Sequence, residues 1–178
     1  MKTTTLIHPL AGALAFALVL GGCTESPEQT ARDVAEAQRE RAAEVAEAER
    51  ELKTTVADAN AKVDRNLAEA QYEVRDAQLD PDVDAEELAE RQREARDSVA
   101  EAQADAGESV AEAAYELAVA RAEGERKVAL ERCEGIDAGA QRDACQANAE
   151  AAFETAKERA LAARERADYS AQSRRDER

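Results

Sequence analysis

The sequence has few bulky side chains. It contains no tryptophan, three tyrosines and two phenylalanines among 178 residues, and only three prolines. Its apolar content of 44% is largely alanine, whereas a thick globular core needs Leu, Ile, Phe and Val to fill its volume. High charge with few large apolar residues favours disorder, but the repeat described below favours helix. The composition therefore predicts an all-α protein of long, alanine-rich helices with coiled-coil-like packing.

Acidic residues outnumber basic ones throughout most of the chain. From Cys23 onward there are 23 basic and 40 acidic side chains, a net charge of −17. Phosphate binding needs clustered Lys and Arg, so nucleic acid is an unsuitable partner, and flat adsorption on anionic lipid is disfavoured too. The charged end, 174–178, is expected to be a frayed, solvated terminus.

The first 22 residues have the layout of a secretory signal peptide. Lys2 is their only charge, and an apolar run extends from Leu10 to Leu20. This run is shorter than the roughly 20 residues needed to span a bilayer. A positive charge followed by a short apolar run is typical of an export signal. No second apolar run follows, so the sequence offers no other candidate span.

The apolar run ends in Leu20-Gly21-Gly22-Cys23, which resembles the lipobox of bacterial lipoproteins. The resemblance implies cleavage after Gly22 and lipidation of Cys23, with residues 23–29 as an acylated N-terminus and short tether. Several buried acyl chains would make this attachment stable. Thr24 is not the aspartate that favours inner-membrane retention in enteric lipoproteins. By the same resemblance, the expected location is the cell envelope, on the periplasmic face of the outer membrane.

An eleven-residue repeat runs through residues 30–134. Its copies begin with Val or Leu, followed by alanine and then an acidic residue, at positions 34, 45, 56, 67, 88, 99 and 110. Eleven residues make three helical turns, so the same positions stay aligned along a nearly straight helix. Positions one, four and eight form a narrow stripe of Val, Leu and Ala that predicts a helix–helix seam, because an ordinary surface helix has a wider apolar arc. The acidic third position is expected to face solvent.

The repeat slips by one residue near 80–84, at Asp80-Pro81-Asp82-Val83-Asp84. Proline disfavours helix at the residue before it. Asp84, with Glu87 three residues later, forms a capping-box pattern. One helix is therefore predicted to end near Leu79 and another to begin near 82–84. The sequence leaves open whether the chain reverses here or only kinks. Ser26, with a proline after it, predicts the start of the first helix.

Two cysteines, Cys133 and Cys145, flank a segment with two glycines. Their midpoint is Gly139, so in an antiparallel hairpin they would face each other below the turn. In an oxidising compartment this predicts a disulfide-linked helical hairpin. The segment also resembles cysteine-bracketed hairpins of uncharacterised exported proteobacterial proteins, a resemblance that carries no activity. Residues 135–178 are expected to form the turn, a third helix over about 141–169 and a tail.

The sequence offers no catalytic constellation. Its only histidine, His8, lies in the predicted signal peptide, so none is left for a triad. A zinc site needs about four ligands, and no Gly-rich phosphate loop is present. We therefore expect a protein that is not an enzyme, with no cofactor, no metal and no small-molecule substrate.

Two functions from different classes fit these observations. The first is a non-enzymatic structural or adaptor rod, anchored by the lipid on Cys23, that self-associates or binds another helical envelope protein. It is similar in plan to the small outer-membrane lipoprotein that forms an alanine-rich coil and joins peptidoglycan through a terminal lysine, but this chain ends in Arg178. The alternative is a stress-protective or lipid-surface protein, because eleven-residue repeats of alanine and charge also resemble desiccation-associated proteins that are partly disordered in solution.

Overall fold

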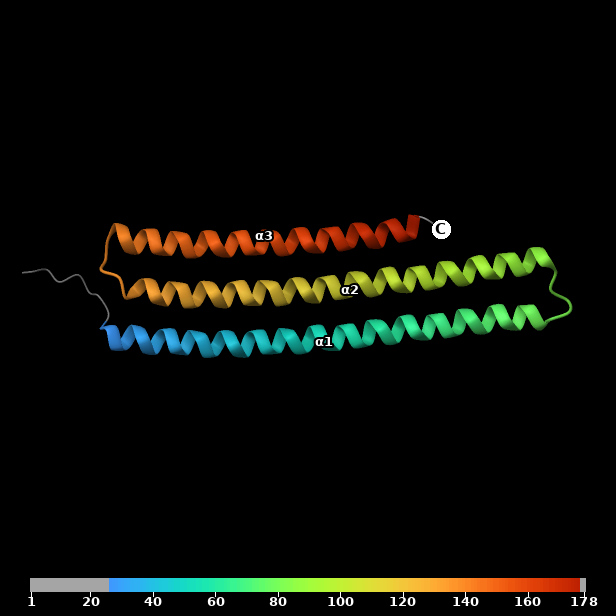
Figure 1. The fold of residues 1–178 in the computed structure, drawn as a ribbon, viewed down its shortest axis with the longest axis horizontal. Helices are drawn as coiled ribbons and strands as arrows, with labels where there is room; N and C mark the ends of the chain where they lie inside the picture. The colour runs from blue at the N-terminus through green and yellow to red at the C-terminus, as the bar shows by residue number, and fades with distance from the viewer. Residues whose placement is uncertain (1–25, 177–178) are drawn as a thin grey trace, which may run out of the picture.

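The computed structural model describes residues 26–176 and shows three helices in this range (Figure 1). Helix α1 spans Pro27–Leu79, α2 spans Ala85–Glu134 and α3 spans Ala140–Asp176. At 1.5 Å per residue, the 53 residues of α1 form a rod about 80 Å long. The prediction of an all-α chain of long helices is confirmed.

Both long helices begin where the sequence places a capping residue. The side chain of Ser26 accepts a hydrogen bond from the backbone N–H of Gln29, with Pro27 in the first turn. The Oδ1 atom of Asp84 accepts hydrogen bonds from the backbone N–H groups of Glu86 and Glu87, at 2.9 and 3.0 Å. Each cap satisfies N–H groups that have no partner within the helix. Helix α1 thus starts directly after Ser26, as the cap predicts, and residues 27–29, which were expected to belong to the tether, are part of the helix.

The break at 80–84 is a reversal. Helix α1 ends at Leu79, and the Oδ1 atom of Asp80 accepts a hydrogen bond from the backbone N–H of Asp82, 2.9 Å away. Beyond this turn α2 runs back along α1, and the two helices are in contact (Figure 1). The predicted ends of both helices are therefore confirmed, and the structure decides between the two alternatives that the sequence left open.

The seam between α1 and α2 is built from small residues. The most buried side chains of α1 are alanines at repeat position four, followed by one more near the reversal, namely Ala37, Ala48, Ala59, Ala70 and Ala77. The Val residues at position one are half-buried, and Leu67 at that position is 42% exposed. The acidic residues at position three are exposed, as expected. Because alanine lets backbones approach closely, the seam is narrow and contains little apolar volume.

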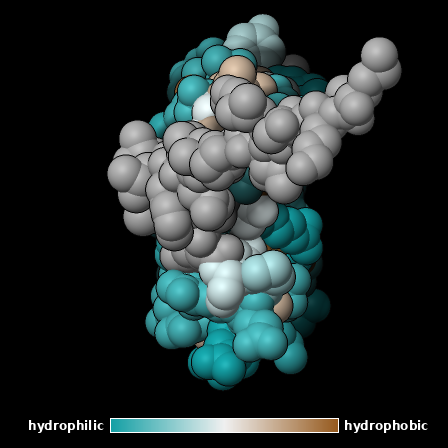
Figure 2. Space-filling view, turned by 90° about the vertical axis from the view of Figure 1, so that its left-hand side faces the viewer, coloured by the Kyte–Doolittle hydropathy of each residue, from teal (hydrophilic) through white to brown (hydrophobic). Residues whose placement is uncertain are grey.

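The helices form an open layer rather than a closed bundle. Helix α2 contacts α1 on one side and α3 on the other, while α1 and α3 do not contact each other within the described range. The three helices lie side by side with α2 in the middle (Figure 1). In an end view, the visible surface of the described residues is mostly hydrophilic (Figure 2). Both broad faces of the layer are therefore left open to solvent.

Helix α3 continues beyond the end expected near Tyr169. It runs to Asp176, and Ala171 is only 1% exposed, so the prediction of a frayed tail is wrong for 170–176. The large residues of α3 contribute little to its packing. Tyr169 is 77% exposed and Leu161 is 39% exposed, while Phe153 is half-buried. Alanines therefore fill the seam between α2 and α3 as well.

The two glycines inside α2 differ in their surroundings. Gly124 is buried, and a Cβ atom at this position would overlap the Cβ and Cγ atoms of Arg41 on α1. These atoms belong to the fixed base of the arginine side chain, so the two helices would have to separate. A Cβ atom at Gly107 would meet only the Nη1 atom of Arg174, at an ordinary distance of 3.6 Å. Only Gly124 is thus required by close helix approach.

We expect Gly124→Ala and Gly107→Ala to change stability in opposite directions. Gly107→Ala should raise the free energy of unfolding by about 1 kcal/mol, the difference in helix propensity between the two residues. Gly124→Ala should lower it, because overpacking typically costs about 1–3 kcal/mol and exceeds the propensity gain. Urea unfolding followed by circular dichroism measures both. A stabilised Gly124→Ala variant would show that the close approach of α1 and α2 is wrong.

Candidate functional surfaces

The predicted lipidation site, Cys23, lies outside the described residues. Helix α1 begins at Pro27, four positions further along the sequence. At the same end of the rod is the turn between α2 and α3, where a Cβ atom at Gly135 would lie 3.0 Å from the Cγ2 atom of Thr30 (Figure 1). The other end of the rod is the reversal at 80–84. The layer therefore has one end next to the predicted anchor and one end about 80 Å away.

A disulfide closes the turn near the predicted anchor. Cys133 and Cys145 are bonded, with their Cα atoms 5.7 Å apart, as the sequence predicted. Gly139, which immediately precedes α3, has a φ angle of 133°, a conformation that side-chain-bearing residues rarely adopt. The guanidinium of Arg142 donates to the backbone oxygens of Ile136 and Glu134, at 2.8 and 3.0 Å. This arginine satisfies carbonyl groups at the C-terminal end of α2 and braces the turn.

A second clamp holds the far end of α3. The guanidinium of Arg175 donates to the carboxylates of Asp105 and Glu108 on α2. The pKa of Asp105 is lowered, mainly by hydrogen bonds from Lys62 of α1 and from Arg175. The pKa of Glu108 is lowered by its hydrogen bond from Arg175. Asp105 therefore joins all three helices through its two basic partners, and no motif in the sequence predicts this contact.

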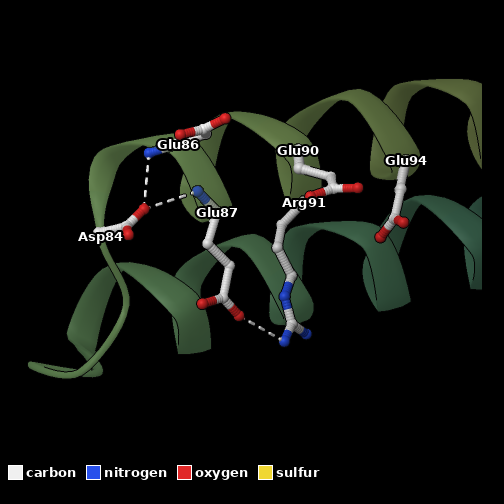
Figure 3. A pocket seen from close by; sticks show the side chains of 6 residues that line it. All are labelled: Asp84, Glu86, Glu87, Glu90, Arg91 and Glu94. Carbon is white, nitrogen blue, oxygen red and sulfur yellow. Dashed lines mark hydrogen bonds and ion pairs between the residues drawn. The ribbon is translucent and has the colours of Figure 1, made fainter.

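The reversal at 80–84 is the most acidic part of the rod. A shallow hollow of about 490 Å³ is lined there by five carboxylates and Arg91 (Figure 3). Asp84 is occupied as a helix cap, and the Nη2 atom of Arg91 donates to Glu87 at 3.1 Å. This hydrogen bond raises the pKa of Arg91. The carboxylates point outward along one helix, as expected for a solvated surface.

Between α1 and α2, one face of the layer carries two grooves with arginine in their walls. The groove nearer the reversal has a volume of about 630 Å³, with Leu67, Val74 and Val99 at its centre and Arg75 and Arg96 at its edges. The groove nearer the anchor end has a volume of about 450 Å³. Its lining includes three further arginines, Arg41, Arg121 and Arg132. We call this surface the arginine face.

The opposite face of the same helix pair is acidic. At the level of the second groove, a hollow on the other side is lined by Asp33, Glu36, Glu40 and Glu131, with Lys127 as its only basic residue. This hollow and the second groove lie between the same parts of α1 and α2 but have different lining residues, so they must open on opposite sides of the helix pair. The acidic hollow at the reversal belongs to this side too, because Glu94 in it is 33 residues, or three repeats, from Lys127. We call this surface the acidic face.

Aromatic residues contribute to the contact between α2 and α3. The guanidinium of Arg126 lies 5.2 Å from the ring centre of Phe153, and that of Arg164 lies 5.5 Å from the ring centre of Tyr115. Such cation–π contacts add modest attraction between helices. Tyr72, on α1, is 69% exposed and takes no part in this contact.

Within residues 26–176, no group of three or more His, Cys, Asp or Glu side chains is placed to hold a metal ion. No helix in the same range combines the length and the hydropathy needed to cross a membrane. Comparisons with protein-family models, with curated proteins and with solved structures found no match to this chain.

We expect loss of the disulfide to destabilise the chain. In the chain-entropy model, a bond that closes a loop of this size contributes about 3 kcal/mol. Urea unfolding should therefore show a drop of about this size in the free energy of unfolding of Cys133→Ser/Cys145→Ser. Dithiothreitol should lower the stability of the wild-type chain to the same level and leave the variant unchanged. Equal stability of oxidised and reduced wild-type protein would contradict the prediction.

The clamp at the end of α3 should depend on pH. Because the pKa values of Asp105 and Glu108 are lowered in the folded chain, the ionised carboxylates stabilise the fold above their ordinary pKa of about 4. This contribution is lost as the pH falls through the lowered values. Arg175→Gln should therefore be less stable than wild type at pH 7, and the difference should narrow at pH values below about 4.

The matched control is Arg174→Gln, which removes the same charge from the same helical turn. Urea unfolding at a series of pH values compares the two variants with wild type. A stability gap for Arg175→Gln that does not change with pH, or an equal gap for Arg174→Gln, would show that the carboxylate contacts do not hold α3.

Proposed function

We propose that this chain is an exported, lipid-anchored protein of the cell envelope that acts as a structural or adaptor rod and not as an enzyme. The observation that carries the proposal is the position of the rod relative to Cys23. A helix about 80 Å long begins four residues after this cysteine, so a lipid there would hold one end of the rod at a membrane. The reversal at 80–84 would then lie far from that membrane.

The internal contacts support a rod that keeps its shape in water. Ion pairs join α1 to α2 at four places, including Arg41 with Glu125 at 2.7 Å and Lys62 with Asp105 at 2.8 Å. The disulfide joins α2 to α3 at one end of α3, and Arg175 joins them at the other. These contacts favour a rod over a protein that is coil until it dries or meets a lipid surface.

The absence of a thick core also supports work by surface contact. The described hollows are shallow and open, and their walls are formed by the outer sides of helices. A rod of this shape holds its far end at a fixed distance from its anchored end and presents two broad faces. We infer that its partners are helical, either a second copy or another envelope protein, and that they bind along the layer. The periplasmic face of the outer membrane is the proposed location.

Metabolic labelling in bacterial cells tests the anchor. Cells expressing the full chain are grown with an alkyne analogue of palmitate, and the protein is then captured and detected. We expect label on the wild-type chain and on Cys133→Ser/Cys145→Ser, and none on Cys23→Ser. Wild type should sediment with membranes and Cys23→Ser should not. An unlabelled wild-type chain would rule out the lipid anchor.

A further inference from the structure

The two faces of the α1–α2 pair carry opposite charge. The two grooves of the arginine face are lined by twenty residues, of which five are arginines and one, Glu125, is a carboxylate. That carboxylate is already paired with Arg41 at 2.7 Å. The two hollows of the acidic face have twelve lining residues, of which nine are carboxylates and two are basic. The lining of the two grooves thus carries far fewer carboxylates than the lining of the two hollows, and Glu49, which lies beside the arginine face, is paired with Arg121 at 2.7 Å.

Both faces follow the eleven-residue repeat. The α1 residues that line the groove near the anchor recur 33 positions later in the groove near the reversal, so that Gln38 corresponds to Gln71 and Ala42 to Arg75. On the other side, an acidic residue recurs at position three of each repeat. One repeat rises about 16 Å along a helix, so the acidic residues recur at this interval. The arginines vary in position from repeat to repeat, since Arg41 corresponds to Val74.

We propose that the arginine face docks the acidic face of a second copy of this chain. Two arginine faces, or two acidic faces, would set like charges against each other, which is unfavourable at an interface. The complementary arrangement is therefore head-to-tail, with different surfaces of the two copies in contact. This contact would cover the apolar lining residues Leu67 and Val99 of the groove while its arginines meet carboxylates. This pairing deepens the proposed rod function by naming its partner and the surface that binds it.

The net charge of −17 per mature chain does not prevent this contact. At physiological ionic strength the Debye length is about 8 Å, so repulsion between distant charges is screened. The contacts between an arginine on one copy and a carboxylate on the other act over shorter distances. The open layer makes the arginine face accessible, because α3 ends at Asp176, beside Asp105, and leaves the groove near the reversal uncovered.

Photo-crosslinking of the full chain in bacterial cells tests the proposal. A benzoyl-phenylalanine probe replaces Gln71, which is exposed and lines the groove of the arginine face near the reversal. The control probe replaces Ala43, an exposed alanine at repeat position ten, on the outer edge of α1. We expect the Gln71 probe to give a product of twice the chain mass, with the crosslinked peptide from the acidic face. The Ala43 probe should give little of this product.

Charge variants then test the chemistry of the contact. Arg75→Glu/Arg96→Glu should reduce the dimeric product from the Gln71 probe at least tenfold, and Arg75→Gln/Arg96→Gln should reduce it less. The control, Arg32→Glu/Arg65→Glu, makes the same charge change at repeat position ten and should leave the product unchanged. Circular dichroism of the purified variants shows whether each keeps its helices. If the glutamate variant unfolds, the comparison of the glutamine variant with the control decides whether the two arginines contribute to the contact between copies.

Several results would overturn the proposal. They are the absence of a dimeric product, capture of a different protein, a crosslink between two arginine faces, and equal loss in the test and control variants. Failure here is distinct from failure of the anchor, because palmitate labelling of Cys23 does not require pairing. Conversely, a chain that pairs without taking up label would retain this interface and lose the proposed tether.

Discussion

The structure depends on a seam of alanine side chains between very long helices. A single methyl group buries little apolar surface, and burial of one CH₂ equivalent stabilises the fold by about 0.8 kcal/mol. No short stretch of this seam is therefore sufficient to hold two helices together. The chain compensates through length, with 53 and 50 residues in the two longest helices. Close approach also makes each contact sensitive to size, and Gly124 against Arg41 is the clearest case. Exposed ion pairs add little stability, and their main effect is to fix the register.

Much of the fold could be predicted from local signals. Ser26 and Asp84 mark helix starts because a cap is a contact between neighbours in sequence, and the cysteine pair marks a hairpin because its midpoint is a glycine. The reversal at Pro81 could not be distinguished from a kink, since proline permits both and the pairing of α1 with α2 decides. The clamp at Arg175 was missed because its partners lie 67 and 70 residues away. The opposite charge of the two faces was missed for the same reason, because it depends on which helices are neighbours.

The hollows described between residues 26 and 176 are open, so the chemistry of this part of the chain lies on its faces. In this layer, the eleven-residue repeat that aligns the seam also places most acidic side chains on the opposite face from the grooves lined by arginine. Positions facing the neighbour are small, positions on one side collect carboxylates, and positions on the other collect arginine, glutamine and alanine. Electrostatic sorting of this kind specifies orientation and partner more than strength. The acidic turn at 80–84 and the disulfide turn then distinguish the two ends of the rod.

The central position of α2 has a consequence for how the molecule opens. Since α1 and α3 share no contact in the described range, each is attached to α2 independently. Detachment of α3 would leave the α1–α2 hairpin with all of its own contacts, as happens at the ends of repeat proteins whose units contact only their neighbours. The disulfide would keep the N-terminal end of a detached α3 covalently linked to α2, near Ile136. The rest of the helix would then rotate away from α2 about this turn. Because α3 would remain tethered, it would rebind the same surface of α2 in an intramolecular step, which makes local opening reversible.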